Sequence, residues 1–299
     1  MSIMTDDKWH NILFWRLRKR YRQVANHELA FCAYIINYCN LNCHGCSRWC
    51  NITKNRLIYK YDDVCRDSLN ILSKTKNTIF FGYSGGEPLI HPEITGLCEF
   101  LGDCRKKFNI PYVSLATNCK RLLKMPDEFF KAMREGQIHL VFSLYPGSKI
   151  NYEECFKRLK DEHIDFNNFT EIDRQPIDDL TEEFFPTQFV LPANYDKKAG
   201  AFSYIKCGVV CPNIWMGNIY KCCNLSFIQT VNDNFDAGIE LKPDDDYIPV
   251  EKYTEDSYFK WLAKPSHFCS AYCHQAKTLR EPWHIGKNIK EEIIQYKTE

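Results

Sequence analysis

Apolar positions along residues 31–200 follow two alternating patterns. Short apolar runs predict four clear strands and two less regular ones, at 31–37, 78–83, 111–116 and 138–144, and at 163–169 and 186–191. Between them, apolar residues recur at helical spacing near 61–74, 93–107, 126–135 and 151–161. Strands that alternate with helices form parallel βαβ units. The pattern therefore predicts an α/β fold with six such units in one domain.

The first 30 residues carry a different pattern. Within residues 8–24, the apolar side chains fall near one helical face and the arginines and lysines lie mostly elsewhere. We expect residues 1–30 to form an amphipathic helix that packs over one end of the domain with its basic face in water. A basic amphipathic helix can also meet a membrane surface or an acidic partner, and that alternative stays open.

The composition is that of an ordinary globular protein with many cysteines. The chain has 299 residues, a net charge of +1 and 44% hydrophobic residues, which is enough for a sizeable core. Near-neutral charge argues against a nucleic-acid partner held by global electrostatics. The sequence has no run of about 18 apolar residues and no signal-peptide core, so we expect a cytoplasmic protein without a membrane span. Sixteen cysteines in such a chain indicate metal binding rather than a disulfide scaffold.

Three of these cysteines follow the first predicted strand at a C-x3-C-x2-C spacing: Cys39, Cys43 and Cys46. From one loop, all three thiols can turn toward a common metal centre and leave its fourth position unfilled. A [4Fe–4S] cluster held in this way has one iron open to an outside ligand, whereas a cluster with four cysteine ligands has none. Cys50 permits another interpretation, because Cys39, Cys43, Cys46 and Cys50 together could form a closed zinc site.

The second predicted strand runs into Ser84-Gly85-Gly86-Glu87-Pro88. Two adjacent glycines let the backbone approach a ligand closely, and the Glu87 carboxylate can accept a hydrogen bond from an ammonium group. Such a segment on its own is usually a turn. Here it lies about forty residues after the cysteine triplet and continues as Leu89-Ile90-His91-Pro92.

With both motifs present, the chain resembles the radical S-adenosylmethionine (radical SAM) superfamily. The resemblance implies a partial (β/α)6 TIM-like barrel with the site at the carboxyl ends of its strands. It also implies that the amino and carboxylate groups of S-adenosylmethionine (AdoMet) chelate the open iron. Gly85, Gly86 and Glu87 would then bind the methionyl amino group.

Three further residues are candidates for contacts with this cofactor. Thr117-Asn118-Cys119 stands where many family members have Thr-Asn-Gly, so Asn118 is a candidate and Cys119 puts the usual tight turn in doubt. Ser143, in a segment similar to the family's Ser-Leu-Asp-Gly, could meet the ribose hydroxyls. Arg174 could clamp a carboxylate through its bidentate guanidinium group. A local cap, turn or solvated role is the alternative for each of them.

A second cysteine cluster begins at residue 207. Apolar runs around Met216-Gly217-Asn218 predict a β-hairpin, and Cys207, Gly217 and Cys222 match the C-x9-15-G-x4-C pattern of the SPASM and Twitch extensions of radical SAM enzymes. Cys269 and Cys273 follow one helical turn apart, and Cys211 and Cys223 are extra thiols. We predict a small extension over residues 201–285, made of a β-hairpin and helix, that holds one auxiliary [4Fe–4S] cluster. Zinc is the alternative metal.

The remainder of the C-terminal third shows less chemistry. Pro243 to Asp246 is typical of a solvated loop, and Tyr253 to Leu262 is predicted to be helical. Residues 286–299 are expected to be a charged tail or helix without chemistry of its own.

The resemblance implies an enzyme that cleaves AdoMet to a 5′-deoxyadenosyl radical, with electrons from a flavodoxin- or ferredoxin-type donor. We predict that the radical removes a hydrogen from a small-molecule or glycan substrate and that a sugar- or cyclitol-like alcohol is oxidised. The first alternative is a radical epimerase in which Cys119, Cys211 or Cys223 donates a hydrogen. Two others are a maturase of a ribosomally made peptide and a non-catalytic zinc-binding interaction module.

Overall fold

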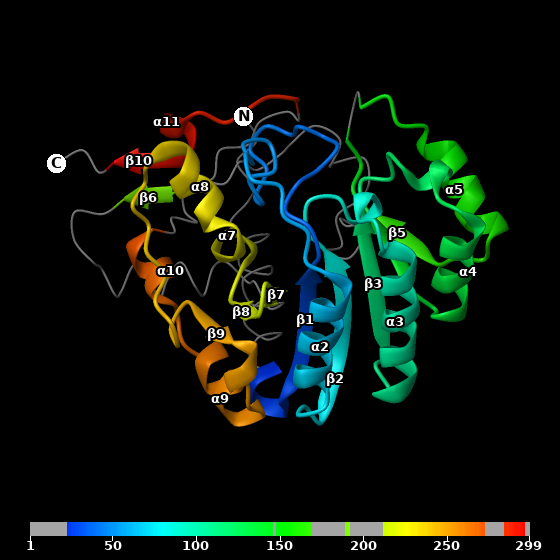
Figure 1. Ribbon diagram of the computed structural model, residues 1–299, viewed down its shortest axis with the longest axis horizontal. Coiled ribbons are helices and arrows are strands. Elements are labelled where there is room, and N and C mark those ends of the chain that lie inside the picture. The colour runs from blue at the N-terminus through cyan, green and yellow to red at the C-terminus, as the bar shows by residue number, and fades with distance from the viewer. Residues whose placement is uncertain (1–22, 146–147, 169–188, 192–211, 273–283, 297–299) are drawn as a thin grey trace, which may run out of the picture.

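The computed structural model describes residues 23–145, 148–168, 189–191, 212–272 and 284–296. Its main sheet has eight strands in the order β5-β4-β3-β2-β1-β7-β8-β9 (Figure 1). The first five strands in sequence run parallel to one another: β1 (Glu28–Tyr34), β2 (Asn77–Ser84), β3 (Tyr112–Thr117), β4 (His139–Phe142) and β5 (Phe166–Asn168). The predicted α/β class and the first five strands are confirmed.

Each crossover between these strands contains a helix at the predicted place. These helices are α2 (Tyr61–Leu72), α3 (Ile94–Lys107), α4 (Asp127–Glu135) and α5 (Tyr152–Asp161). Their buried residues recur at helical spacing, as in α3 with Ile94, Leu97, Cys98 and Leu101, because one stripe of each helix must leave water to cover the sheet. In Figure 1, α2 and α3 lie side by side over β1, β2 and β3.

The sixth predicted strand does not join this sheet. Only its last residues are described, as β6 (Phe189–Leu191), and they pair in parallel with β10 (Ile294–Tyr296) in a separate two-stranded sheet. The free edge of β1 is instead taken by β7 (Asn213–Trp215), which runs parallel to it. Hydrophobic periodicity predicts that a segment is extended but not which edge it pairs with.

The predicted β-hairpin is confirmed. β7 and β8 (Asn218–Tyr220) pair antiparallel around Met216 and Gly217, and β9 (Tyr247–Pro249) pairs with β8. Because β7 also pairs with β1, the hairpin extends the main sheet, and Trp215 and Phe227 share a buried cluster with Tyr34 on β1.

Five helices follow the hairpin in the described residues: α7 (Cys223–Ser226), α8 (Ile228–Phe235), α9 (Glu255–Leu262), α10 (His267–Ala271) and α11 (Lys290–Ile293). The predicted helix at 253–262 corresponds to α9, which Thr254 caps by accepting from the Ser257 amide. Residues 1–22 of the N-terminal helix predicted for residues 1–30 lie outside the described residues, and the prediction is wrong for residues 28–30, which begin β1.

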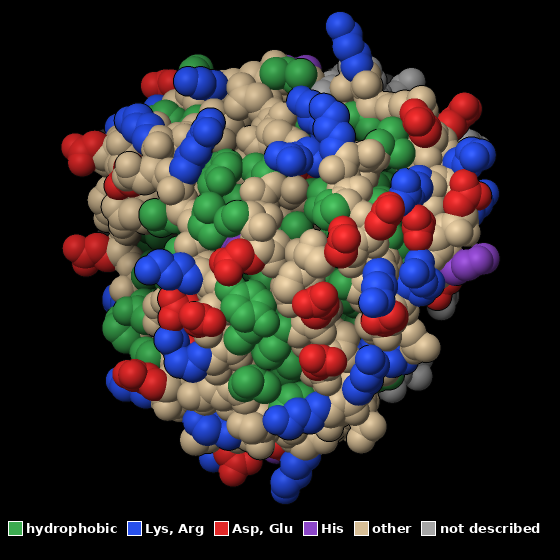
Figure 2. Space-filling view, turned by 45° about the vertical axis from the view of Figure 1, so that its right-hand side comes forward, with side chains coloured by type: hydrophobic (Ala, Val, Ile, Leu, Met, Phe, Trp, Pro, Cys, Tyr) green, Lys and Arg blue, Asp and Glu red, His purple; other side chains and the backbone are tan. Residues whose placement is uncertain are grey.

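The surface agrees with the near-neutral composition. Figure 2 shows basic and acidic side chains interspersed over the face that it presents. In the part of the chain that the structure describes, no helix combines the length and apolar character that a membrane crossing requires.

Candidate metal and cofactor site

The cysteine loop is attached by its backbone to the Gly-Gly-Glu segment. Beyond the ends of β1 and β2, the two segments that follow these strands continue to pair. Ile35 N donates to Ser84 O at 3.0 Å, and Gly86 N donates to Ile36 O at 2.7 Å. Glu87 N then donates to Tyr38 O at 3.0 Å, one residue before Cys39. The two motifs recognised in the sequence therefore lie side by side at the carboxyl edge of the sheet.

The two glycines are required by this contact. A Cβ atom on Gly86 would lie 1.9 Å from Tyr38 O, and one on Gly85 would lie 2.4 Å from Ile36 O. Gly85 also has a φ of 142°, which side-chain-bearing residues rarely adopt. The sequence suggested that the glycines admit a ligand, whereas the structure shows that they admit the cysteine loop.

Glu87 joins the ends of β2 and β3. Its side chain is 1% exposed, and its Oε1 accepts from Leu89 N at 3.0 Å and from Thr117 Oγ1 at 2.6 Å. Its Oε2 accepts from Asn118 N at 2.7 Å. Burial raises the pKa of Glu87, while these three donors favour the charged form. A carboxylate has about four acceptor sites, so these three donors leave about one of them unused.

Glu87→Gln is therefore expected to affect both the fold and cofactor binding. The amide NH2 would face a backbone or hydroxyl donor, which should lower the free energy of unfolding by roughly 1–3 kcal/mol. Loss of a charge-assisted contact to an ammonium group should weaken AdoMet binding about ten- to a hundredfold. Urea denaturation and equilibrium binding measure the two effects. Glu93→Gln, at an exposed glutamate whose side chain does not cap α3, should change neither.

The end of β3 also reaches the first cysteine. Asn118 Nδ2 donates to Cys39 Sγ at 3.4 Å and to Asn40 Oδ1 at 2.9 Å, and Leu41 N donates to Cys39 Sγ at 3.3 Å. N–H donors favour a thiolate over a thiol. Burial nevertheless raises the pKa of Cys39, with the Glu87 charge adding to that effect. A metal ion is the usual partner that brings such a buried thiol into its thiolate form.

Tyr145 lies close enough to all three cysteines of the triplet for their charges to act on it. Burial raises the pKa of Tyr145, and the negative charges of Cys43, Cys46 and Cys39 raise it further. Tyr145 follows β4, so the carboxyl ends of four neighbouring strands contribute to the surroundings of the triplet. Ser143 lies at the same edge, where its N donates to Thr117 O at 3.1 Å.

The donor set fits an iron–sulfur cluster in its chemistry. Within the described residues, no three Cys, His, Asp or Glu side chains converge on a position for a single metal ion. A zinc site would place the four thiolates of Cys39, Cys43, Cys46 and Cys50 on one metal ion. A cluster makes a different demand, because each thiolate binds its own iron atom. Cys50 Sγ donates to Arg48 O at 3.8 Å, and the Cys50 thiol lowers the pKa of the Cys46 thiol.

Arg48 is a site residue that the sequence analysis missed. Its Nη2 donates to Ser84 Oγ at 3.0 Å, and its Cζ lies 5.3 Å from the centre of the Tyr34 ring. Burial opposes its charge, but Tyr34, Cys223 and Cys46 raise the pKa of Arg48 on balance. The charge of Cys223, beyond the hairpin, therefore acts on this cation of the cysteine loop. In the sequence, Arg48 is a single arginine among the cysteines. Such a residue does not indicate a site until the fold shows what it contacts.

Part of the second cysteine cluster can also be placed. Cys222 precedes α7, Cys223 begins it, and Cys269 lies on α10. Lys221, the residue before Cys222, is 3% exposed, and its charge opposes the rise that burial causes in the pKa of the Cys269 thiol. Cys269 therefore lies near Cys222 and Cys223 in the fold. Cys207, Cys211, Cys273 and Arg174 lie outside the described residues.

The predicted solvated loop at 243–246 is wrong for its last residue. Asp246 is 0% exposed, and its Oδ1 accepts from Phe268 N at 2.8 Å. Asp245 Oδ2 accepts from His267 N at 2.8 Å. Both carboxylates satisfy amides in the first turn of α10, which the run of acidic residues did not reveal. The loop thus fixes the helix that carries Cys269.

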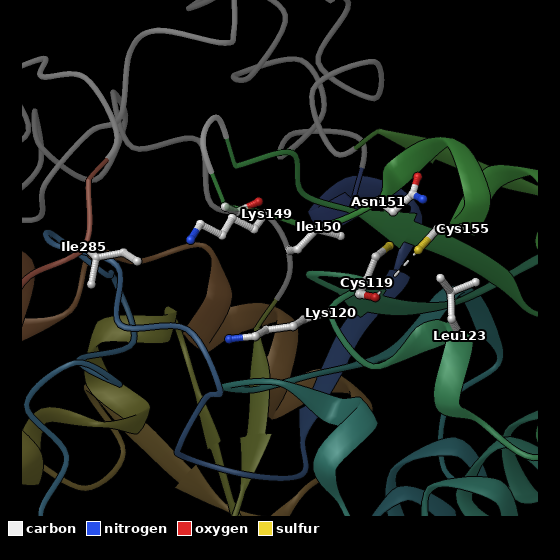
Figure 3. A pocket seen from close by; sticks show the side chains of 9 residues that line it. Cys119, Lys120, Leu123, Lys149, Ile150, Asn151, Cys155 and Ile285 are labelled. Carbon is white, nitrogen blue, oxygen red and sulfur yellow. Dashed lines mark hydrogen bonds between the residues drawn. The ribbon is translucent and has the colours of Figure 1, made fainter.

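A pocket of about 470 Å³ lies beside the site, at the ends of β3 and β4 (Figure 3). Its lining comes from the loop after β3, the start of α5 and the C-terminal segment: Cys119, Lys120, Leu123, Ser148, Lys149, Ile150, Asn151, Cys155 and Ile285. Lys120 Nζ donates to Asn40 O at 2.9 Å, so the pocket adjoins the cysteine loop. Cys119 has a φ of 63°, the left-handed conformation that glycine adopts most readily.

No protein-family model matches the chain, and no curated protein matches it in sequence. Similar solved structures include BtrN in complex with AdoMet and 2-DOIA, with a TM-score of 0.48, 11% identity, and coverage of 84% of this chain and 98% of BtrN. The native anSMEcpe structure with bound AdoMet has a TM-score of 0.38, 19% identity, and coverage of 47% of this chain and 43% of that one. SuiB from Streptococcus suis, bound to S-adenosylmethionine, has a TM-score of 0.36, 18% identity, and coverage of 56% and 40%. The chain thus spans less than half the length of anSMEcpe and SuiB.

Proposed function

We propose that this chain is a radical SAM enzyme. The observation that carries the proposal is the meeting of three strand ends at Cys39: the cysteine loop after β1, the Gly-Gly-Glu segment after β2 and Asn118 after β3. Cys39, Cys43 and Cys46 would hold a [4Fe–4S] cluster. AdoMet would bind beside Gly85, Gly86 and Glu87, with Asn118, Ser143 and Arg174 as further candidate contacts.

The bound cluster and AdoMet would supply a 5′-deoxyadenosyl radical, which removes a hydrogen atom from the substrate. The protein's part is to bind and orient. Glu87 has a remaining acceptor site for the methionyl ammonium group. Asn118 Nδ2 and Leu41 N stabilise negative charge on Cys39, and Arg48 adds a half-buried positive charge near Cys46. In a poorly hydrated site such contacts are worth more than they are in water.

We further propose that the substrate is a sugar- or cyclitol-like alcohol and that it is oxidised. The pocket beside the cysteine loop supports a polar small molecule, since Lys120, Lys149 and Asn151 contribute donors to its lining. Figure 3 shows both lysines extending toward the side where Ile285 lies. Removing a second electron requires an acceptor, which an auxiliary [4Fe–4S] cluster on Cys222, Cys269 and thiols from Cys207, Cys211 and Cys273 would provide. A flavodoxin- or ferredoxin-type protein is the proposed electron donor.

Epimerisation is a second candidate because of Cys119, which lines the pocket and is 1% exposed. Its hydrogen bond with Cys155 and its burial raise the pKa of Cys119, so the residue keeps its S–H bond at neutral pH. A thiol in this form can return a hydrogen atom to a substrate radical. Cys223 and Cys211 are the other candidate donors. Product formed in deuterium oxide would carry carbon-bound deuterium only if the enzyme epimerises.

Anaerobic reconstitution with iron and sulfide tests the proposed function. We expect about eight irons per chain, as two [4Fe–4S] clusters, since each cysteine group suffices for one. Iron and sulfide analysis with electron paramagnetic resonance (EPR) of the reduced protein measures this result. Protein that is purified anaerobically with zinc alone, and that assembles no cluster on reconstitution, would contradict the proposal and support the zinc-module alternative.

A further inference from the structure

The C-terminal segment from residue 284 to residue 292, which we call the C-terminal strap, lies against the cysteine loop. Gly286 N donates to Asn42 O at 2.9 Å, and His44 N donates to His284 O at 3.0 Å. Cys43 and Ile285 thereby form an antiparallel bridge. The sequence analysis expected a tail without chemistry from residue 286 onward, and the structure instead brings this segment to the central cysteine of the triplet.

One side chain of the strap enters the turn between Cys43 and Cys46. Asn288 is 4% exposed, and its Oδ1 accepts from Gly45 N at 3.0 Å and from Asn51 Nδ2 at 2.5 Å. Gly45 has a φ of 68°, so the turn between the last two cysteines is left-handed at this residue. An acceptor for its amide stabilises that conformation, because a buried amide without a partner is destabilising.

Further contacts fix the strap around this point. Asn51 Nδ2 also donates to Gly286 O at 3.0 Å, and His44 Nε2 lies 3.0 Å from Glu292 Oε2. The rings of His44 and His284 are stacked with their centres 4.4 Å apart. Figure 1 shows the strap, in red, beside the blue loop that follows β1. The strap therefore contacts the loop through its backbone and through the side chains of Asn288, His284 and Glu292.

We propose that Asn288 is a positioning residue for the cysteine triplet: it holds the Cys43–Cys46 turn in the conformation that receives the metal. The metal part of this inference rests on the proposed function, whereas the positioning part concerns the metal-free chain as well. Asn288 touches neither substrate nor cofactor in this role. It acts on the cysteine turn through its hydrogen bond with the Gly45 amide. Its second hydrogen bond, with Asn51, holds the strap in place.

Hydrogen exchange of the full-length, metal-free protein tests the positioning directly. In Asn288→Ala, peptides covering residues 42–47 should exchange about fivefold faster, since the Gly45 amide loses an acceptor worth about 1 kcal/mol. Asn288→Asp keeps an acceptor oxygen for the Gly45 amide but turns its second oxygen toward Glu292 Oε2, so its exchange should be slower than that of Asn288→Ala without matching the wild type. Asn51→Ala removes the second donor to Asn288 and should accelerate the same peptides to a smaller extent. It keeps the test open if Asn288→Ala does not fold.

Asn232→Ala is the matched control. Asn232 lies on α8, where its Nδ2 donates to Ile239 O at 2.8 Å and its Oδ1 accepts from Ile239 N at 3.0 Å. Its replacement should not change exchange at residues 42–47. Unchanged exchange there in both Asn288→Ala and Asn51→Ala would overturn the inference, as would equal acceleration in Asn232→Ala, because general loosening would then explain the effect.

A second arm uses the reconstituted protein. Iron content should fall from about eight toward about four atoms per chain in Asn288→Ala and stay at the wild-type level in Asn232→Ala. The EPR signal of the cluster on the triplet should weaken or change shape in Asn288→Ala alone. Full iron with an unaltered spectrum would overturn the metal part of the inference. If the wild type holds no cluster but exchange still accelerates in Asn288→Ala, the positioning stands and the proposed function fails.

Discussion

Changing Cys39, Cys43 and Cys46 together to alanine is expected to halve the iron of the reconstituted protein, from about eight to about four atoms per chain. It should also abolish AdoMet cleavage. The reason is that the triplet would supply every protein ligand of the cluster beside Gly85–Glu87, while Cys222 and Cys269 lie beyond the hairpin and supply another group. Iron and sulfide analysis, together with 5′-deoxyadenosine formation under a chemical reductant, measures both effects.

Cys98→Ala provides the control for this change. Cys98 is a fully buried thiol on α3, so its replacement removes a cysteine from the core without touching the loop. We expect full iron content and AdoMet cleavage in this variant, with a modest loss of stability. Unchanged iron in the triple variant would contradict the assignment of the triplet as metal ligands, even if the wild type cleaves AdoMet.

Gly86→Ala is expected to lower the free energy of unfolding of the metal-free protein by roughly 2–6 kcal/mol. The added methyl group would lie 1.9 Å from Tyr38 O, so the cysteine loop and the segment after β2 must separate. Overpacking typically costs about 1–3 kcal/mol. The bonds from Gly86 N to Ile36 O and from Glu87 N to Tyr38 O each add about 0.5–1.5 kcal/mol if they break. Urea denaturation followed by circular dichroism measures the loss.

Gly96→Ala makes the same chemical change inside α3. The new methyl group would meet Tyr61 at 3.4 Å, an ordinary contact, and alanine favours the helix by about 1 kcal/mol over glycine. We expect this variant to be as stable as the wild type or slightly more so. Equal stability of Gly86→Ala and Gly96→Ala would mean that the loop contact at Tyr38 does not hold the two motifs together.

The elements were predictable because each depends on neighbouring residues. The apolar run at 78–83 gave β2, and the helical spacing at 93–107 gave α3, each within one residue of its observed ends. The hairpin around Gly217 was equally local. Pairing is not local: β6 lies beside β10 and β7 beside β1, and three-residue strands carry too little pattern to specify a partner.

The candidate site, too, was predictable only in part from the sequence. The spacing of Cys39, Cys43 and Cys46 and the Gly85-Gly86-Glu87 segment were visible in the sequence, because the chemistry needs those residue types close together in the chain. Their physical roles were not visible. That Gly86 admits Tyr38, and that Glu87 binds the amide of Asn118, follow only from the way β1, β2 and β3 lie side by side.

The sequence by itself therefore determined the α/β class, the elements from β1 to β5, the β7–β8 hairpin and the two motifs that suggest the chemistry. Only the tertiary structure decided which residues support those motifs. No local pattern marks Arg48, Asp246 or Asn288 for the contacts that each of them makes. Asn288 and Gly45 are 243 positions apart. A hydrogen bond acts over about 3 Å in space, and the packing of the whole chain, rather than local periodicity, brings such residues within that distance.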